Sequence, residues 1–460
     1  MIFERPLIYL LPAFAGITAA CASVVAYSWS STLINLACSI QDDSFYYLIP
    51  GWNAAHGHGF TFGGETTSGW QPLYELLLTL LSLACNSVES LLRLAINLNG
   101  WLFALTAAVA GIALRPLITA ATPGLRQSAV ALSLCVAVLS FLCLHTAFFS
   151  SLTGKENALA ALLLASLIWR VLAPGRGIGK PLGVGLLCAL LLLTRIAPTS
   201  ITYASIAILL LHGRRQKLIA LSVGLVPLVA WGVFAQQYFG HVLPMSMLVK
   251  MNSPKHVSAL ASARIGLEYF WESTKYSLSA ASRFNVLQLQ ARAGLRDTFQ
   301  TGLMGAALAV SMLGLLKSER AGATSRAVVA LAAFDVAGVA GNVLLGVALA
   351  GKSDDIYYTV WYVYDLPVLV AINCGFAIAW IQAQLSATRF NRATTTVLAL
   401  ACVTYFVGDI AWYVRLRPYD ASDDAKFAGT SQIKKFEAAS WFLANVAPTN
   451  PDYKVAAYSA

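Results

Sequence analysis

Charged residues are scarce in this chain of 460 residues: Asp, Glu, Lys and Arg make up 11% of it, whereas hydrophobic residues make up 58%. A soluble domain carries about 25% charged residues, so this chain could not cover its surface with polar groups in water. The composition excludes a soluble globular protein and predicts an integral membrane protein. The first apolar run, residues 7–27, is too long for the h-region of a signal peptide, and we expect it to be retained as a first helix.

Clustered basic charge, paired cysteines and internal repeats are missing as well. The net charge is +10, but Lys and Arg are scattered between apolar runs, which excludes the basic stripe of a nucleic-acid-binding protein. The eight cysteines form no CxxC pair and no Cys/His metal spacing, so we expect buried thiols, no structural disulfide and no zinc.

Apolar runs predict an all-α, polytopic membrane protein with about eleven transmembrane helices. The runs lie at 7–28, 93–114, 127–148, 156–173, 182–194, 197–212, 218–239, 301–316, 327–350, 362–384 and 393–414. Short connectors rich in Lys and Arg separate many of them, and the positive-inside rule places these connectors and the N-terminus in the cytoplasm. The C-terminus is then outside.

This topology places large segments on the outer face. The loop 29–92 contains a short helix, 73–84, which at about 1.5 Å per residue cannot cross a bilayer alone and is either re-entrant or lies on the surface. The loop 240–300 is expected to form amphipathic helices on the outer surface. Residues 1–414 thus form the transmembrane domain, and 415–460 begin an outer C-terminal region. A lone strand near the chain end either pairs with another element or belongs to a longer protein, and we favour the second interpretation.

The outer loop begins with two adjacent carboxylates, Asp42 and Asp43. A carboxylate here could take the proton of an attacking hydroxyl group; the simpler interpretation is that two charges solvate the end of a loop. Aromatic residues, including Tyr46 and Trp52, follow at helical spacing. The carboxylates are therefore expected on an amphipathic surface helix rather than on a free loop.

Two turns follow this helix. In the first, glycines would let the backbone approach a phosphate that His56 and His58 help to bind, although a solvated turn explains the same residues. The second turn, 66–72, is rich in hydroxyl groups. There Thr67 and Trp70 could contact a sugar or phosphate, or the turn could cap the next helix.

Arg195 lies between two short apolar segments, which predict a helical hairpin that dips toward the outer face and breaks at Pro198. A charge near the membrane interior costs about 2.5–3.5 kcal/mol on insertion scales. Arg195 therefore needs a partner, either a lipid phosphate or a carboxylate within an apolar run, namely Asp335, Asp365 or Asp409.

Four further charged residues lie at the ends of predicted helices. Lys155 and Glu156 begin a helix, where Glu156 is favourable on dipole grounds alone or belongs to the site. Lys250 follows a crossing and could reach a phosphate, or could simply snorkel. Asp365 begins a crossing and would need a partner.

These pieces, in this order, resemble the polyprenyl-phosphate-sugar-dependent membrane glycosyltransferases of the type C fold (GT-C). The nearest likeness is the bacterial branch of the mycobacterial terminal arabinofuranosyltransferases, with the protein O-mannosyltransferases more distant. The similarity is strongest in residues 42–74, DDSFYYL…AHGHGFTFGGETTSGWQPLY. It is weaker in residues 154–156, 195–197, 240–250 and 361–367. The chain departs from the family at Lys155, where Met is frequent, and at Ile196-Ala197, where Pro-Asp is frequent.

The resemblance implies an inverting glycosyltransferase that moves a sugar from a polyprenyl-phosphate donor to a hydroxyl group of a glycan, lipid or protein acceptor. It implies a bacterial inner-membrane protein of the cell envelope, surrounded by membrane lipid, with its active site on the outer face. Asp42 or Asp43 would be the general base, and a divalent cation (Mg²⁺ or Mn²⁺) beside them is left open. Candidates for binding the donor phosphate are Lys250, Arg195, His58 and His56. The substrate cavity would contain Tyr46, Trp52, Thr67, Trp70, Glu156 and Asp365.

Two other functions remain open. A transporter or lipid flippase would also have many helices and intramembrane charges, but would more often show two related halves and helices broken near the midplane. A non-catalytic scaffold is the third alternative. Polar residues concentrated in outer loops favour the enzyme.

Overall fold

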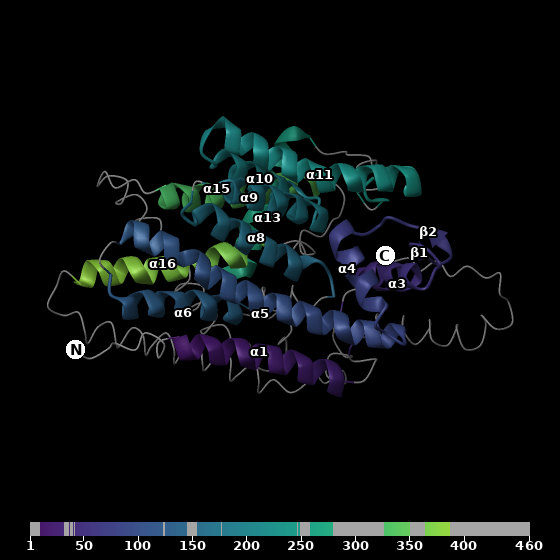
Figure 1. Cartoon of the computed structure of the whole chain (residues 1–460), viewed down its shortest axis with the longest axis horizontal. Coiled ribbons are helices and arrows are strands. Elements are labelled where there is room, and N and C mark those ends of the chain that lie inside the picture. The colour runs from purple at the N-terminus through teal and green to yellow at the C-terminus, as the bar shows by residue number, and fades with distance from the viewer. Residues whose placement is uncertain are drawn as a thin grey trace.

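A computed structural model describes residues 10–31, 36, 40, 42–122, 125–144, 154–175, 177–245, 247–248, 258–278, 326–349 and 364–386. This part of the chain is mostly helical, with twelve α-helices, one 3₁₀ helix and one two-stranded sheet. Figure 1 shows the long helices side by side in one bundle, with α3, α4 and the two strands at one end. The all-α class predicted from the sequence is confirmed.

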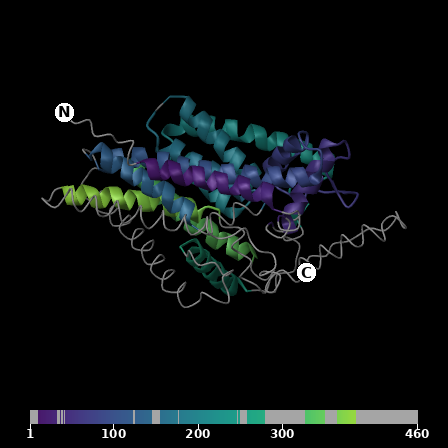
Figure 2. The same cartoon turned by 90° about the horizontal axis from the view of Figure 1, so that it is seen from below.

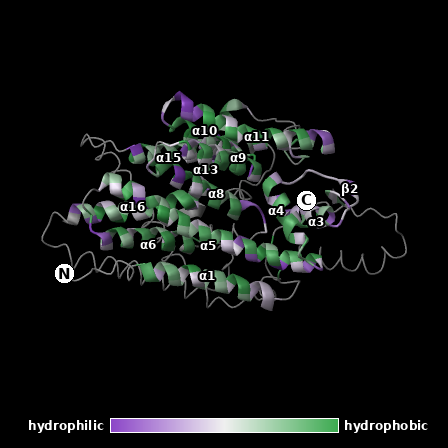
Figure 3. Cartoon of the chain, viewed as in Figure 1, coloured by the Kyte–Doolittle hydropathy of each residue, from purple (hydrophilic) through white to green (hydrophobic). Residues whose placement is uncertain are grey.

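Five helices are long and apolar enough to cross a membrane. They are α1 (Leu11–Ser30), α5 (Val88–Ala121), α11 (Gly213–Phe239), α15 (Arg326–Leu349) and α16 (Leu366–Ser386). Figure 3 shows hydrophobic residues along the bundle and hydrophilic residues mainly toward helix ends. These features are those of an all-α membrane protein.

The remaining helices are shorter. They are α3 (Phe45–Ala55), α4 (Pro72–Ser82), α6 (Gln127–Cys143), α8 (Asn157–Leu172), α9 (Gly179–Thr194), α10 (Pro198–Leu209) and α13 (Ala259–Leu278). Each of them falls where the sequence predicts helix. The expected crossings at 301–316 and 393–414 and the tail 415–460 lie outside the described residues.

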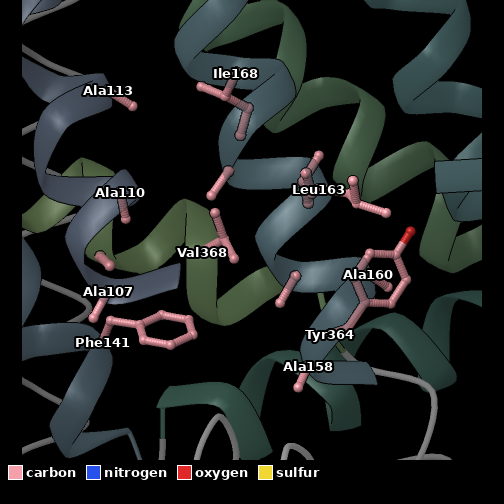
Figure 4. Close-up of a cluster of buried hydrophobic side chains, with 14 of the residues drawn as sticks. Ala107, Ala110, Ala113, Phe141, Ala158, Ala160, Leu163, Ile168, Tyr364 and Val368 are labelled. Atoms are coloured by element: carbon pink, nitrogen blue, oxygen red, sulfur yellow. The ribbon is translucent and has the colours of Figure 1, made fainter. Parts of the chain in front are cut away.

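The centre of the bundle is built on small side chains. Along α5, Ala107, Ala110 and Ala113 are fully buried and let α6, α8 and α16 approach closely (Figure 4). On α16, a Cβ atom at Gly375 would lie only 2.8 Å from the carbonyl oxygen of Ser133 on α6. Such close approach is how helices gain van der Waals contact where lipid supplies no hydrophobic driving force.

The α9–α10 pair breaks where the sequence predicts. Thr194 ends α9, and Pro198 is the first residue of α10, where its missing N–H costs nothing. Arg195 therefore lies in the turn between two antiparallel helices. A second small-residue crossing, at Gly185 and Gly224, holds α9 against α11.

The segment 240–300, expected to lie on the outer surface, is described in part. Its helix α13 packs along α15, and Figure 2 shows the two side by side on one flank of the bundle. Their crossing is close, because a Cβ atom at Gly266 would lie 2.7 Å from the carbonyl oxygen of Val343.

The chain between α3 and α4 forms a small hairpin. Strands β1 (Thr61–Phe62) and β2 (Glu65–Thr66) pair antiparallel. The two residues between them, Gly63 and Gly64, both have positive φ, at +60° and +82°. Glycine is the natural choice for such a turn.

The α9–α11 crossing gives the first prediction. A methyl group at Gly185 would lie 2.2 Å from the carbonyl oxygen of Ala220, a backbone atom that cannot rotate away. Gly185→Ala should lower the free energy of unfolding by about 1–3 kcal/mol, measured by thermal unfolding in detergent. In the control Gly232→Ala the new methyl would meet only Val242, at 3.6 Å, and the better helix propensity of Ala should leave stability equal or higher. Equal midpoints for the two variants would contradict this packing.

Candidate functional site

The two adjacent carboxylates begin the site. Asp42–Ser44 forms the 3₁₀ helix η2, which leads directly into α3. The carboxylate of Asp43 is half-exposed and pairs with the Nζ atom of Lys155 at 2.6 Å. Lys155 itself is buried. The half-exposed carboxylate of Asp43 is thus held in place by the buried ammonium group of Lys155. The side chain of Asp42 lies outside the described residues.

Backbone geometry fixes Lys155. Gly154 has a φ of +76°, and a Cβ atom there would lie 3.1 Å from Ser44. The carbonyl oxygen of Gly154 lies 3.3 Å from the hydroxyl group of Tyr74, and Asn99 donates a hydrogen bond to the carbonyl oxygen of Lys155 at 3.2 Å. The short connection before α8 is therefore attached to both α4 and α5.

Glu156 forms a second, fully buried ion pair. Its Oε1 atom lies 2.9 Å from the Nη1 atom of Arg195, and its Oε2 atom accepts a hydrogen bond from Tyr47 at 2.8 Å. Arg195 also donates to the side chain of Asn157. The partner of Arg195 is thus Glu156, which was not among the expected partners. Its charge is compensated at the start of α8 rather than by a carboxylate of a later helix.

The turn at Arg195 has two further contacts. The backbone N–H of Ile196 donates to the side-chain oxygen of Gln71 at 3.0 Å, which joins the α9–α10 turn to the start of α4. The guanidinium carbon of Arg195 lies 5.7 Å from the ring centre of Tyr364, close enough for a cation–π contact. Beyond Tyr364, the carboxylate of Asp365 accepts hydrogen bonds from Tyr203 and Asn342 at 2.7 and 2.8 Å. Asp365 therefore has two neutral partners.

The histidines lie on the exposed turn after α3. His56 stacks on the ring of Trp52 at 3.9 Å and donates to its carbonyl oxygen. His58 is exposed. Gly57 and Gly59 have φ values of +83° and +69°, so the turn needs glycine for its backbone shape whether or not it binds a phosphate.

Most of the expected cavity aromatics pack against protein. Tyr46 contacts Phe62 at 4.8 Å, and the half-buried Trp52 stacks on His56. Trp70 is buried in an aromatic cluster that joins the hairpin to the end of α11. The cluster contains Phe60, Trp70, Trp231, Phe234, Tyr238 and Phe239.

Thr67 forms a hydrogen bond within its own turn. Its hydroxyl oxygen accepts the backbone N–H of Gly69 at 3.2 Å, and Ser68 accepts the N–H of Met245 at 3.2 Å. The N-cap of α4 is Gln71, with Pro72 following. The hydroxyl-rich turn therefore fixes the loop and its contact with the segment that follows α11. Its last residues, Gln71 and Pro72, also begin α4, but no side chain of the turn caps that helix by a hydrogen bond. Lys250 lies outside the described residues.

Sequence reasoning missed several members of the site. Tyr47 lies four residues after Asp43, hence on the same helical face, and this spacing could have identified it. Asn99 is a polar residue in a long apolar run, which is itself a signal in a membrane protein. Glu75 is the least expected, because it sits in an apolar sequence and becomes fully buried on α4.

Glu75 is a buried acid against α3. A Cβ atom at Gly51 would lie 3.3 Å from its Oε1 atom. Within the described part of the chain, neither of its carboxylate oxygens has a hydrogen-bond partner. Burial raises the pKa of the Glu75 carboxyl well above its usual range. A buried acid whose neutral form is favoured therefore lies close to Tyr47 and Tyr74.

A metal fits this arrangement poorly. One oxygen of Asp43, Oδ2, is occupied by the ammonium group of Lys155, which places a positive charge next to any cation bound there. No group of three or more His, Cys, Asp or Glu residues with metal-binding geometry occurs among the residues that the structure describes. The chemistry supported here is that of an oriented carboxylate.

The buried ion pair gives a sharp stability test. Arg195→Met would leave the Glu156 carboxylate buried and uncompensated, and should lower the free energy of unfolding by about 3–5 kcal/mol. The matched control, Arg264→Met, breaks an exposed pair with Glu268 and should cost less than about 1 kcal/mol. Adding Glu156→Gln to Arg195→Met should recover part of the loss. Equal effects of the two arginine variants in thermal unfolding would show that the buried pair is not formed.

Glu75 gives a pH test. Its pKa is higher in the folded than in the unfolded state, so folding is favoured below the unfolded value of about 4.3, and stability falls as the pH rises toward the folded value. Glu75→Gln should reduce the loss of stability between about pH 5 and pH 8, measured by thermal unfolding. Glu89→Gln, an exposed carboxylate, should leave the pH profile unchanged. A wild-type profile retained in Glu75→Gln would contradict the assignment.

Comparisons of the chain with protein families, with curated proteins and with solved structures find no match.

Proposed function

We propose that the protein is an inverting glycosyltransferase of the GT-C type, which transfers a sugar from a polyprenyl-phosphate donor to an acceptor hydroxyl group. The observation that carries the proposal is the meeting of distant motifs at one end of the bundle. Asp43 pairs with Lys155, and the adjacent Glu156 pairs with Arg195. These motifs were singled out separately in the sequence.

Asp43 is the proposed general base. Its carboxylate is half-exposed while the cation that orients it is buried, so it can face an incoming hydroxyl group without being free to rotate away. The acceptor oxygen attacks the anomeric carbon as its proton passes to Asp43. The bond from the anomeric carbon to the phosphate oxygen breaks with inversion, and polyprenyl phosphate leaves with the electron pair. No step is routed through a metal ion.

The leaving phosphate needs cationic contacts. Arg195 is buried and its charge is compensated by Glu156, so its role is to position the site. Among the described candidates, His58 and His56 are exposed on the turn after α3 and are better placed to meet a phosphate. Lys250 is retained as a proposed contact.

The position of the site fits an outer active site in the inner membrane of a bacterium. Helix α11 begins near Arg214 and Arg215 and ends at Phe239, which packs against Phe60 and Trp70 from the chain between α3 and α4. At about 1.5 Å per residue, its 27 residues are long enough to cross a bilayer. By the positive-inside rule the arginine end is cytoplasmic, and the site end is then outside. We propose about eleven crossings in the whole chain, with the N-terminus inside.

Transport is the competing function, and one observation favours it. Asp335 is buried inside the membrane-spanning helix α15, where Asn373 on α16 donates to it at 2.9 Å. Buried intramembrane carboxylates are frequent in transporters. Uptake or flipping of a labelled polyprenyl-phosphate sugar across vesicles, without transfer to an acceptor, would favour this alternative.

The transfer reaction gives a direct test. The purified protein is supplied with polyprenyl-phosphate sugars and a set of acceptors, and product formation is measured. Asp43→Asn should reduce the rate by about 10²–10⁴-fold, the usual contribution of a general base, because it keeps the shape of the side chain but cannot accept the proton. Glu89→Gln, a carboxylate of the exposed pair with Arg93, should retain full activity.

Asp42→Asn distinguishes between the two carboxylates. If Asp43 is the base, Asp42→Asn should be much less impaired than Asp43→Asn. A larger loss in Asp42→Asn would assign the base to Asp42 instead. Full activity in both variants would rule out the proposed mechanism.

A further inference from the structure

A second polar cluster lies inside the bundle, beyond the site described above. Its centre is Asp365, which directly precedes α16 and is fully buried. Its Oδ2 atom accepts hydrogen bonds from Tyr203 on α10 and Asn342 on α15. The backbone N–H groups of Asp365 and Leu366 also face the carboxyl group, but its Oδ1 atom makes no hydrogen bond of standard geometry within the described ranges. All of these donors are neutral, so hydrogen bonding alone leaves the negative charge of an ionised Asp365 uncompensated in a low-dielectric interior.

Two more oxygens of this region make no hydrogen bond of standard geometry in the part of the chain that is described. They are Oδ1 of Asn342 and Oγ1 of Thr199, and both residues are fully buried. The Thr199 hydroxyl group lies near that of Tyr364, the residue before Asp365. The two come from adjacent helices in close contact, because a Cβ atom at Gly341 would lie 2.7 Å from the Cα atom of Thr199. One carboxylate oxygen from the residue before α16, one amide oxygen from α15 and one hydroxyl oxygen from α10 thus occur in the same buried region.

Arg195 is the cationic side chain that approaches this cluster, but it does not neutralise Asp365. Arg195 contacts the ring of Tyr364, but its guanidinium group pairs with Glu156 and Asn157. The described residues form no salt bridge with Asp365. A buried carboxylate without a counter-charge costs several kcal/mol, so its neutralisation must come from a bound cation or a proton.

We propose that Asp365, Asn342 and Thr199 bind a monovalent metal cation of sodium type. Hard cations prefer carboxylate, carbonyl and hydroxyl oxygens, which is what these three atoms offer. A single carboxylate balances a single positive charge, whereas a divalent ion would leave excess charge in the interior. Helix ends near the membrane interior are also where sodium is coordinated in other membrane proteins. The site is independent of sugar transfer and would stand if Asp43 proved not to be a base.

The first measurement uses the wild-type protein alone. The purified protein in detergent is unfolded thermally in sodium chloride, potassium chloride and N-methylglucamine chloride at equal ionic strength. The midpoint should be highest in sodium and should rise with its concentration until the site is full. Binding of radioactive sodium, measured on the same preparation, should saturate. Identical midpoints in all three salts would overturn the proposal.

Variants then locate the site. Asp365→Asn removes the charge and should weaken sodium binding by at least about tenfold, and Asn342→Ala should also weaken it. The matched control is Asp335→Asn, which changes the other buried aspartate of this region, one bonded to Asn373 instead. It should bind sodium as the wild type does. Equal loss in Asp335→Asn and Asp365→Asn would overturn the assignment to Asp365.

A proton is the competing neutralising agent, and pH separates the two. Competition between sodium and protons should make sodium binding weaker as the pH falls, with the same maximal occupancy at saturating sodium. If lowering the pH stabilises the protein while sodium has no effect at any pH, Asp365 is held as a protonated acid and the cation site does not exist. The wild-type titrations decide this even if a variant fails to fold.

Discussion

The buried ion pair between Arg195 and Glu156 is the constraint on which the site depends. Neither charge could remain buried in an apolar bundle alone, because desolvation would cost several kcal/mol without compensation. Paired at 2.9 Å, they hold the turn between α9 and α10 against the start of α8. Tyr47, which donates to the second oxygen of Glu156, adds α3 to the same junction. One pair thus fixes three segments that are far apart in the sequence.

The exposed half of the site depends on this buried half. Lys155 and Glu156 are neighbours in the chain, and each reaches a different partner: Lys155 pairs with Asp43, and Glu156 pairs with Arg195. Because exposed ion pairs are weak on their own, the contact of Lys155 with Asp43 would not order a loop by itself. Ordering Glu156 in the interior also orders Lys155, so the open carboxylate gains a fixed support without having to be buried.

Helix positions could be predicted from the sequence with little error, because apolar runs and breakers mark them directly. Pro198 and Pro72 begin helices where expected. The need of Arg195 for a partner also followed from the cost of a buried charge. The identity of that partner did not, because Glu156 at a helix start already had a sufficient local explanation in the helix dipole.

Side-chain direction was the larger obstacle. Trp70 was expected to line a cavity, but it packs into the aromatic cluster at the end of α11. The order of residues in a turn does not show which neighbours a side chain will contact, so this packing could not be predicted. Glu75 was overlooked because the helix α4 is apolar on both sides of it. The hairpin 61–66 was also missed, since strands of two residues leave no periodicity to detect.

The buried acids that the structure describes fall into two groups by their neighbours. Glu156 meets a guanidinium group and can stay ionised. Glu75, Asp335 and Asp365 meet only neutral donors or, for Glu75, no donor among the described residues. The low dielectric that makes the Glu156 pair strong makes an ionised form of the other three costly. Each of these three must therefore bind a proton or a cation for the bundle to remain packed as it is. Folding and ion binding are then linked, and the polar interior is sensitive to solution conditions at positions away from the exposed carboxylate.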